Sequence, residues 1–210
     1  MDQNVILVET VPLEFDLESL GCRLRIRPGQ TKFMDRLSRL AEEAARVARP
    51  KAVARLCGLT ILDEEKVQVG EVTFSSPLLR QKMDGLGRAF SYLASEGTEL
   101  ADWSLSLSSS LEQVFASALR EVAVQQAENL LERTLLERYG IAQVSAMNPG
   151  SLKVWSLEEQ VPLFELLAPL PEKLGVTLLP SLMMRPEYSV SGVFFQTDSK
   201  FYNCPSFNVR

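Results

Sequence analysis

The sequence of 210 residues contains no histidine. Histidine is the side chain whose ordinary pKa lies nearest neutrality, so its absence excludes Ser-His-Asp catalysis, Cys-His catalysis and His-ligated zinc. Only three cysteines are present, Cys22, Cys57 and Cys204, and none of them forms a CxxC pair. We therefore expect no disulfide framework and no structural zinc site, and a reducing cytoplasm is the simplest location. We interpret Cys204 as an ordinary free thiol.

Long apolar stretches and an excess of positive charge are also missing. No run of about 18 apolar residues occurs, so no membrane span is predicted, and residues 1–10 lack the features of a signal peptide. The net charge is −5, and a chain this acidic has no overall attraction to phosphate backbones. Neither a membrane nor a nucleic acid is an expected partner.

Sequence motifs for autonomous catalysis are equally scarce. Gly85-Leu86-Gly87 begins a dinucleotide-binding fingerprint, but Phe90 occupies the third glycine position. There is no GxSxG motif. The acidic runs 63–65 and 158–159 are best explained as a turn and as a helix start, where negative charge meets the helix dipole favourably. No catalytic residue is evident, and the pattern leaves open whether the chain is an enzyme.

Hydrophobic periodicity predicts a mixture of strands and helices. Strands are expected over 5–8, 23–27, 52–62, 67–74, 89–94, 141–145, 176–183 and 189–196, and helices over 31–48, 110–139 and 156–167, with shorter ones starting at Ser76-Pro77 and Thr98. The last two strands are expected to pair with each other. The helix 110–139 is the clearest element and would be about 45 Å long.

This order of elements determines the predicted fold class. Strands and helices alternate irregularly and include hairpins, which favours an α+β fold over a doubly wound parallel sheet. The length suits one domain of generous size. We divide it into an N-terminal α/β portion, 1–105, and a core, 106–210, which together are expected to form one compact domain.

Two segments are difficult to explain by packing alone. Residues 148–150 read Asn-Pro-Gly, which predicts a turn. Residues 183–192 end in Gly192 inside a strand pattern, which indicates a bulge or a close approach of another backbone or a ligand. Ser189 and Ser191 would present two hydroxyl groups on one face. The alternative is a turn followed by an edge strand whose serines face water.

These segments carry a family resemblance. The stretch 175–202, with Met184, Pro186 and the run Ser-Val-Ser-Gly at 189–192, resembles the end of the activation domain of cobalamin-dependent methionine synthase. Residues 147–160 resemble small stand-alone relatives of that domain. The resemblance implies a twisted antiparallel sheet with flanking helices, one of them long. It also implies a domain that binds S-adenosylmethionine in a shallow groove and docks over a corrinoid, where an electron donor supports reductive remethylation.

The resemblance also suggests where a groove for S-adenosylmethionine or the corrinoid would lie. Its residues are Glu121, Asn148, Pro149, Gly150, Ser151, Ser189, Ser191, Gly192, Phe201 and Tyr202. The sequence departs from the family at Ala146, where the family has an arginine that meets the ligand carboxylate. Serine at 151 and phenylalanine at 201 stand where the family has tyrosines.

Three functions are compatible with these features. The first is a cytoplasmic module that docks on a corrinoid protein or cobalamin-dependent methyltransferase and assists its reductive reactivation, with a possible electron donor protein as second partner. The lack of histidine supports it, because the family's corrinoid-carrying modules use an Asp-x-His-x-x-Gly loop. The second is an S-adenosylmethionine-binding component of such a methyltransferase. The third is a scaffold that kept the fold without either role.

Overall fold

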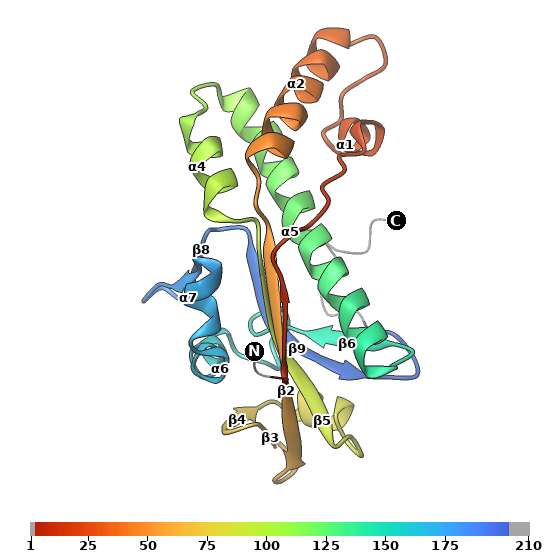
Figure 1. The fold of residues 1–210 in the computed structure, drawn as a ribbon, viewed down its shortest axis with the longest axis vertical. Helices are drawn as coiled ribbons and strands as arrows, with labels where there is room; N and C mark the ends of the chain where they lie inside the picture. Colours follow the sequence, from red (N-terminus) through yellow and green to blue (C-terminus); the bar gives the residue numbers. More distant parts are fainter. Residues whose placement is uncertain (1–2, 202–210) are drawn as a thin grey trace.

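A computed structural model describes residues 3–201. Its main feature is a seven-stranded antiparallel sheet with helices against both faces and a helical layer beyond one end (Figure 1). The strand order is β4-β3-β2-β5-β9-β6, and β1 also pairs with β2. The α+β class expected from the sequence is confirmed.

The described elements have the following bounds. The strands are β1 Val5–Val8, β2 Lys51–Ile61, β3 Lys66–Val69, β4 Val72–Ser75, β5 Arg88–Ser95, β6 Val144–Met147, β7 Thr177–Leu178, β8 Met184–Arg185 and β9 Ser189–Gln196. The helices are α1 Leu17–Arg23, α2 Thr31–Val47, α3 Pro77–Lys82, α4 Thr98–Ser106, α5 Ser110–Tyr139, the 3-10 turn η1 Leu157–Glu159, α6 Gln160–Leu167 and α7 Leu170–Leu174.

The sheet joins the two portions of the chain. β2 pairs with β5 along Lys51–Gly58, and β5 pairs in turn with β9, from Phe90 opposite Phe194 to Ser95 opposite Ser189. β5 belongs to residues 1–105 and β9 to residues 106–210. A boundary at 105/106 therefore runs through one shared sheet.

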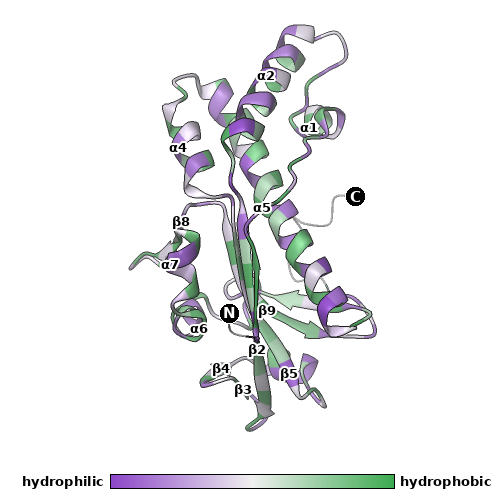
Figure 2. Cartoon of the chain, in the orientation of Figure 1, coloured by the Kyte–Doolittle hydropathy of each residue, from purple (hydrophilic) through white to green (hydrophobic). Residues whose placement is uncertain are grey.

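Three apolar clusters hold the layers together, and α5 contributes to two of them. Its C-terminal half packs on one face of the sheet, where Val124, Ala127 and Leu131 are buried. Its N-terminal half packs against α1, α2 and α4. The opposite face of the sheet is covered by α3, α6 and α7. Figure 2 shows the resulting contrast between the largely hydrophobic strands and the more hydrophilic α2.

The long helix follows its prediction at both ends. α5 starts at Ser110 and ends at Tyr139, and Gly140 adopts the left-handed conformation with φ of 61°. Its N–H donates to the carbonyl of Leu136, which closes the last turn. Although α5 has 30 residues, no helix in the described part of the chain combines the length and apolarity that crossing a membrane requires.

The strand predicted over 23–27 is wrong, because helix capping determines this segment. The Asp16 side chain accepts hydrogen bonds from the backbone N–H groups of Glu18 and Ser19, which starts α1 at Leu17. After the helix, Arg25 adopts φ of 56° and ends it. The alternation of arginine and apolar residues arises because the apolar ones pack on the helical cluster while the arginines face solvent.

Two further strand predictions needed correction. Residues 67–74 form a hairpin, because Gly70 adopts φ of 61° and turns the chain between β3 and β4. Residues 176–183 form only the two-residue β7, because the turn at 179–182 reverses the chain after it. β7 pairs with β8 and not with β9, whose neighbours are β5 and β6.

A buried ion pair joins the sheet to α5. Glu96, at the end of β5, is fully buried and accepts two hydrogen bonds from Arg120, from Nε at 2.6 Å and from Nη2 at 2.7 Å. The Arg120 guanidinium also lies 4.5 Å from the ring centroid of Tyr188. Burial raises the pKa of Glu96, and the Arg120 hydrogen bonds oppose that rise. Arg120 is therefore the positively charged partner that opposes the effect of burial on this carboxylate.

We predict that Arg120→Met destabilises the protein by about 3–5 kcal/mol near neutral pH, because it leaves the Glu96 charge buried without its partner. In this variant burial raises the pKa of Glu96 in the folded state alone, so the penalty grows as pH rises above the unfolded-state pKa and disappears below it. Urea unfolding as a function of pH measures this. Adding Glu96→Gln should recover part of the loss, and an equal loss at every pH would contradict the prediction.

Candidate functional site

The predicted turn and the predicted serine-containing strand lie side by side. β6 pairs with β9 so that Met147 is opposite Val193. The next residue, Asn148, donates a hydrogen bond of 2.8 Å from Nδ2 to the backbone carbonyl of Ser191. Residues more than 40 positions apart in the sequence thus form one continuous structure at the end of β6.

Gly192 allows this close contact. A Cβ atom at this position would lie 2.3 Å from the carbonyl oxygen of Met147 and 2.6 Å from Asn148 Nδ2. It would also lie 2.9 Å from the ring of Tyr92. The close backbone approach expected at this glycine is confirmed, and the approaching backbone is the chain's own β6.

A polar cluster lies at this point on the face of the sheet that α5 covers, and it includes a residue of α5. The Tyr92 hydroxyl donates to Glu128 Oε1 at 2.7 Å and accepts a hydrogen bond of 2.7 Å from Asn148 Nδ2. Burial raises the pKa of Tyr92, and the nearby Glu128 carboxylate raises it further. Burial also raises the pKa of Glu128, which the hydrogen bond from Tyr92 opposes. Tyr92 therefore remains neutral: its hydroxyl donates to Glu128 and accepts the hydrogen bond that fixes the Asn148 side chain.

Sequence reasoning missed Tyr92 and Glu128 as members of this cluster. A signal for Glu128 was available, because it lies on the α5 stripe that also carries Val124 and Leu131. A carboxylate on an apolar stripe needs a buried partner. Tyr92 had no comparable signal. It reads as an ordinary strand residue until the register places it opposite Gly192.

The turn itself is fixed by internal contacts. Gly150 has φ of 79°, and a Cβ atom there would lie 2.8 Å from Leu157. Its N–H donates to the carbonyl of Trp155 at 2.8 Å. The Trp155 ring is fully buried and meets Phe74 edge-on, at 5.6 Å between centroids. The loop 148–155 is thus anchored in the core below it, while Gly150 and Ser151 are exposed.

Ser189 and Ser191 do share one face of β9, as expected, but these hydroxyls do not line an open groove. Ser191 is 2% exposed and points toward the face covered by α6 and α7, with Val193 and Phe195. The Ser189 hydroxyl donates to the carbonyl of Pro186 at 2.8 Å and lies 2.9 Å from Ser95 Oγ. The polar cluster at Tyr92 lies on the other face.

The remaining predicted residues are dispersed. Glu121 forms an ion pair with Arg23 of α1, two helical turns from Glu128. The Phe201 N–H donates to Ser145 Oγ at 2.7 Å, and its ring packs on the cluster beneath α6. Tyr202 lies outside the described residues. Pro149 is buried within the turn. Whether any of these residues contacts a ligand stays a prediction.

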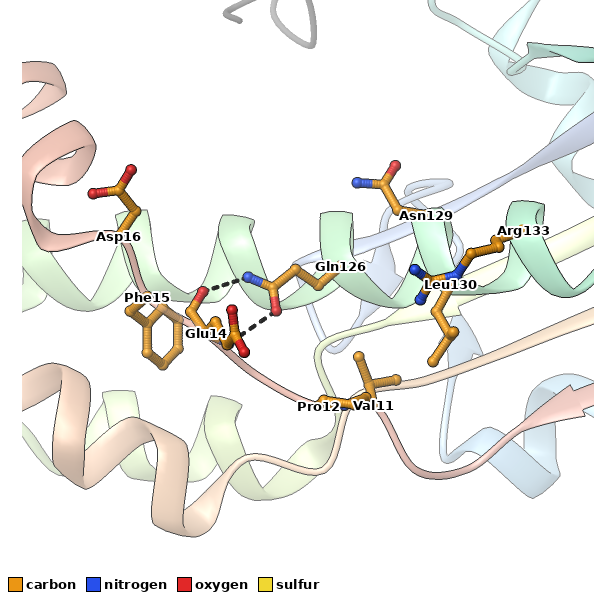
Figure 3. Close-up of a pocket in the computed structure, with 9 residues that line it drawn as sticks. All are labelled: Val11, Pro12, Glu14, Phe15, Asp16, Gln126, Asn129, Leu130 and Arg133. Carbon is orange, nitrogen blue, oxygen red and sulfur yellow. Dashed lines mark hydrogen bonds between the residues drawn. The ribbon is translucent and has the colours of Figure 1, made fainter.

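Two of the described pockets lie elsewhere on α5. Figure 3 shows one of about 600 Å³ between α5 and residues 11–16. The Gln126 amide bridges the gap, since its Oε1 accepts from the Glu14 N–H at 3.1 Å and its Nε2 donates to the Glu14 carbonyl. Asn129 and Arg133 line the same pocket. A second pocket of about 730 Å³ adjoins it near α1. Neither pocket contains a residue of the predicted groove.

Comparison with known proteins identifies the fold. No family model and no curated protein matches the chain. Among solved structures, the reactivation domain of MetH bound to AdoHcy matches with a TM-score of 0.63 over 94% of this chain and 80% of that chain, at 17% identity. The chain has the fold of the MetH reactivation domain. The long helix implied by the resemblance is α5. The likeness supports the fold that the sequence resemblance implied.

We predict that Gly192→Ala destabilises the protein by about 1–3 kcal/mol, because the new methyl group collides with the Met147 carbonyl and the Asn148 amide. Chemical denaturation measures the change. Gly58→Ala is the matched control, because Gly58 also lies in a strand and has no atom within 4 Å of the added Cβ. Equal effects of the two substitutions would show that the contact at Gly192 is not tight.

Proposed function

We propose that the chain is an activation-domain-like module that docks on a corrinoid protein or a cobalamin-dependent methyltransferase and assists its reductive remethylation. The observation that carries this proposal is the likeness to the MetH reactivation domain along 94% of the chain. A second support is the contact between the Asn148–Gly150 turn and the Ser189–Gly192 strand. The sequence resemblance places both segments at one groove, so they have to be neighbours.

In this proposal the chemistry belongs to the partner's corrinoid and to the small-molecule methyl donor. The corrinoid supplies the metal that accepts the electron and the methyl group, and this chain docks and orients. The electron comes from a separate donor protein. We assign no catalytic role to the polar cluster, since the Tyr92 hydroxyl donates its hydrogen bond to the Glu128 carboxylate.

The exposed part of the loop 148–155 is the proposed contact with the corrinoid partner. Gly150, Ser151, Lys153 and Val154 are exposed, and Val154 is 46% exposed although it is apolar. The loop is held from below by buried Trp155 and by Pro149. A fixed loop with an exposed apolar residue loses little conformational freedom on docking.

Three positions expected near S-adenosylmethionine do not suit that ligand in this chain. Ala146 offers a methyl group where the family has a guanidinium, and a methyl group cannot pair with a carboxylate. The Asn148 amide donates to Tyr92 and Ser191, and Ser191 Oγ is buried on the opposite face. We therefore assign no step of the reaction to these residues as ligand contacts.

Docking can be tested with the isolated corrinoid-binding domain of a methionine synthase. We expect Val154→Arg to weaken its binding at least about tenfold, because a charge replaces an apolar contact in the interface. Leu62→Arg is the matched control, since Leu62 is an apolar residue of similar exposure, 48%, in the turn between β2 and β3. Fluorescence titration measures both. No binding by the unaltered chain, or equal losses in both variants, would count against the proposal.

Calorimetry with S-adenosylmethionine separates this proposal from the second function that the sequence left open. The AdoHcy bound to the MetH domain is the observation that favours the alternative. We expect no saturable heat below about 1 mM ligand, because the charge-assisted contact at 146 is missing. Micromolar binding would instead identify the chain as an S-adenosylmethionine-binding component.

A further inference from the structure

Positive charge is concentrated in one segment of this acidic protein. Residues 23–49 contain eight lysine and arginine side chains and three acidic ones, so this segment carries +5. The whole chain carries −5, and the rest therefore carries −10. The segment comprises the end of α1, the following loop and α2. Figure 1 places the α1–α2 loop at one end of the long axis of the molecule.

Most of the arginines on α2 and α1 have ion-pair partners. Arg36 and Arg39 both bind Glu112 of α5, and Arg46 lies 3.8 Å from Glu42. Arg23 binds Glu121. Arg23, Arg36 and Arg39 therefore link the helices of the layer, although their side chains remain partly exposed.

Three cations differ from these. Arg25, Arg27 and Lys32 are exposed, and none forms an ion pair within residues 3–201. Phe33 follows directly and is 38% exposed. We call these four residues the basic surface.

Two residues of the basic surface, Arg25 and Lys32, oppose a local stability rule. Arg25 occupies the left-handed position that ends α1, where its N–H donates to Cys22 and the N–H of Ile26 donates to Gly21. Glycine is the residue that this position favours. Lys32 lies in the first turn of α2, which contains no acidic residue, so it faces the positive end of the helix dipole. Such departures are expected where a surface serves a function.

The loop that carries the basic surface is fixed in place. The Gln30 N–H donates to the Arg27 carbonyl at 3.1 Å, and the Arg27 N–H donates to Gln30 Oε1 at 2.7 Å. Pro28 and Gly29 occupy the middle of this turn, with φ of 88° at Gly29. Because the backbone of this turn is already fixed, only the charged side chains need to become ordered on binding.

We propose that the basic surface is the docking site for a protein partner with an acidic face. Opposite charges steer such encounters and set their orientation, and Phe33 supplies an apolar contact among the charges. A nucleic acid fits less well, because the charge of −10 outside residues 23–49 repels an extended phosphate backbone. This proposal does not depend on the corrinoid partner.

The test uses the full chain and a fluorescein-labelled acidic peptide of Glu-Glu-Glu-Leu repeats. We expect the triple variant Arg25→Gln, Arg27→Gln, Lys32→Gln to raise the peptide Kd at least about tenfold at low salt. The control triple Lys66→Gln, Arg133→Gln, Lys173→Gln removes the same charge from exposed positions elsewhere and should change the Kd less than about twofold. Phe33→Ala should also weaken binding. No measurable peptide binding, or equal losses in both triples, overturns the proposal.

A DNA duplex of similar charge distinguishes the other class of partner. If the duplex binds the chain more tightly than the peptide does, the surface serves nucleic acid and the proposal fails. Arg25→Gly adds a second readout, because it relieves the left-handed backbone while it removes the charge. We expect it to raise the melting temperature by about 2–4 °C and to weaken peptide binding. Unchanged peptide binding by this variant would contradict a role for Arg25.

Discussion

The contact between Glu96 and Arg120 is the point on which the arrangement of the layers depends. Glu96 ends β5, Arg120 belongs to α5, and Tyr188 immediately precedes β9. The backbone of Glu96 donates to the Tyr188 carbonyl at 3.0 Å, and the Tyr188 N–H donates to Glu96 Oε1 at 3.2 Å. One buried carboxylate thus joins three segments, and it does so where the helical layer meets the sheet. A buried charge tolerates few alternative geometries, because each lost hydrogen bond leaves a desolvated ion.

Two glycines, Gly97 and Gly192, allow backbone segments to approach each other closely. Gly97 follows Glu96, with φ of 87°, and a Cβ atom there would lie 2.4 Å from the Arg49 carbonyl. This close approach brings the end of β5 against the segment that leads from α2 into β2. Gly192 does the same between β9 and β6. In both places the glycine sits beside a polar anchor, Glu96 in one case and Asn148 in the other, so close packing and hydrogen bonding fix the same joints.

The surfaces proposed for binding are rigid for the same reason, and they lie on different parts of the fold. The loop 148–155 rests on Trp155 and on the joint at Gly192, whereas the basic surface rests on α1, α2 and the turn at 27–30. Arg23, Arg36 and Arg39 form ion pairs with glutamates of α5. The cations of the basic surface form no such pairs within residues 3–201 and are therefore accessible to a partner. A partner at the basic surface would leave the loop 148–155 uncovered, since Figure 1 places the α1–α2 loop far from β6.

The sequence by itself determined the elements that local rules govern. The helix 110–139 was predictable, because its apolar stripe and its terminal glycine act within the helix. The turn at 148–150 and the close approach at Gly192 were predictable from proline and glycine chemistry. Only the tertiary structure decided the cluster of Tyr92, Glu128 and Asn148, since strand register and helix rotation bring these side chains together. It also decided which strands pair with β9 and which arginines form ion pairs with α5, because both depend on neighbours distant in the chain.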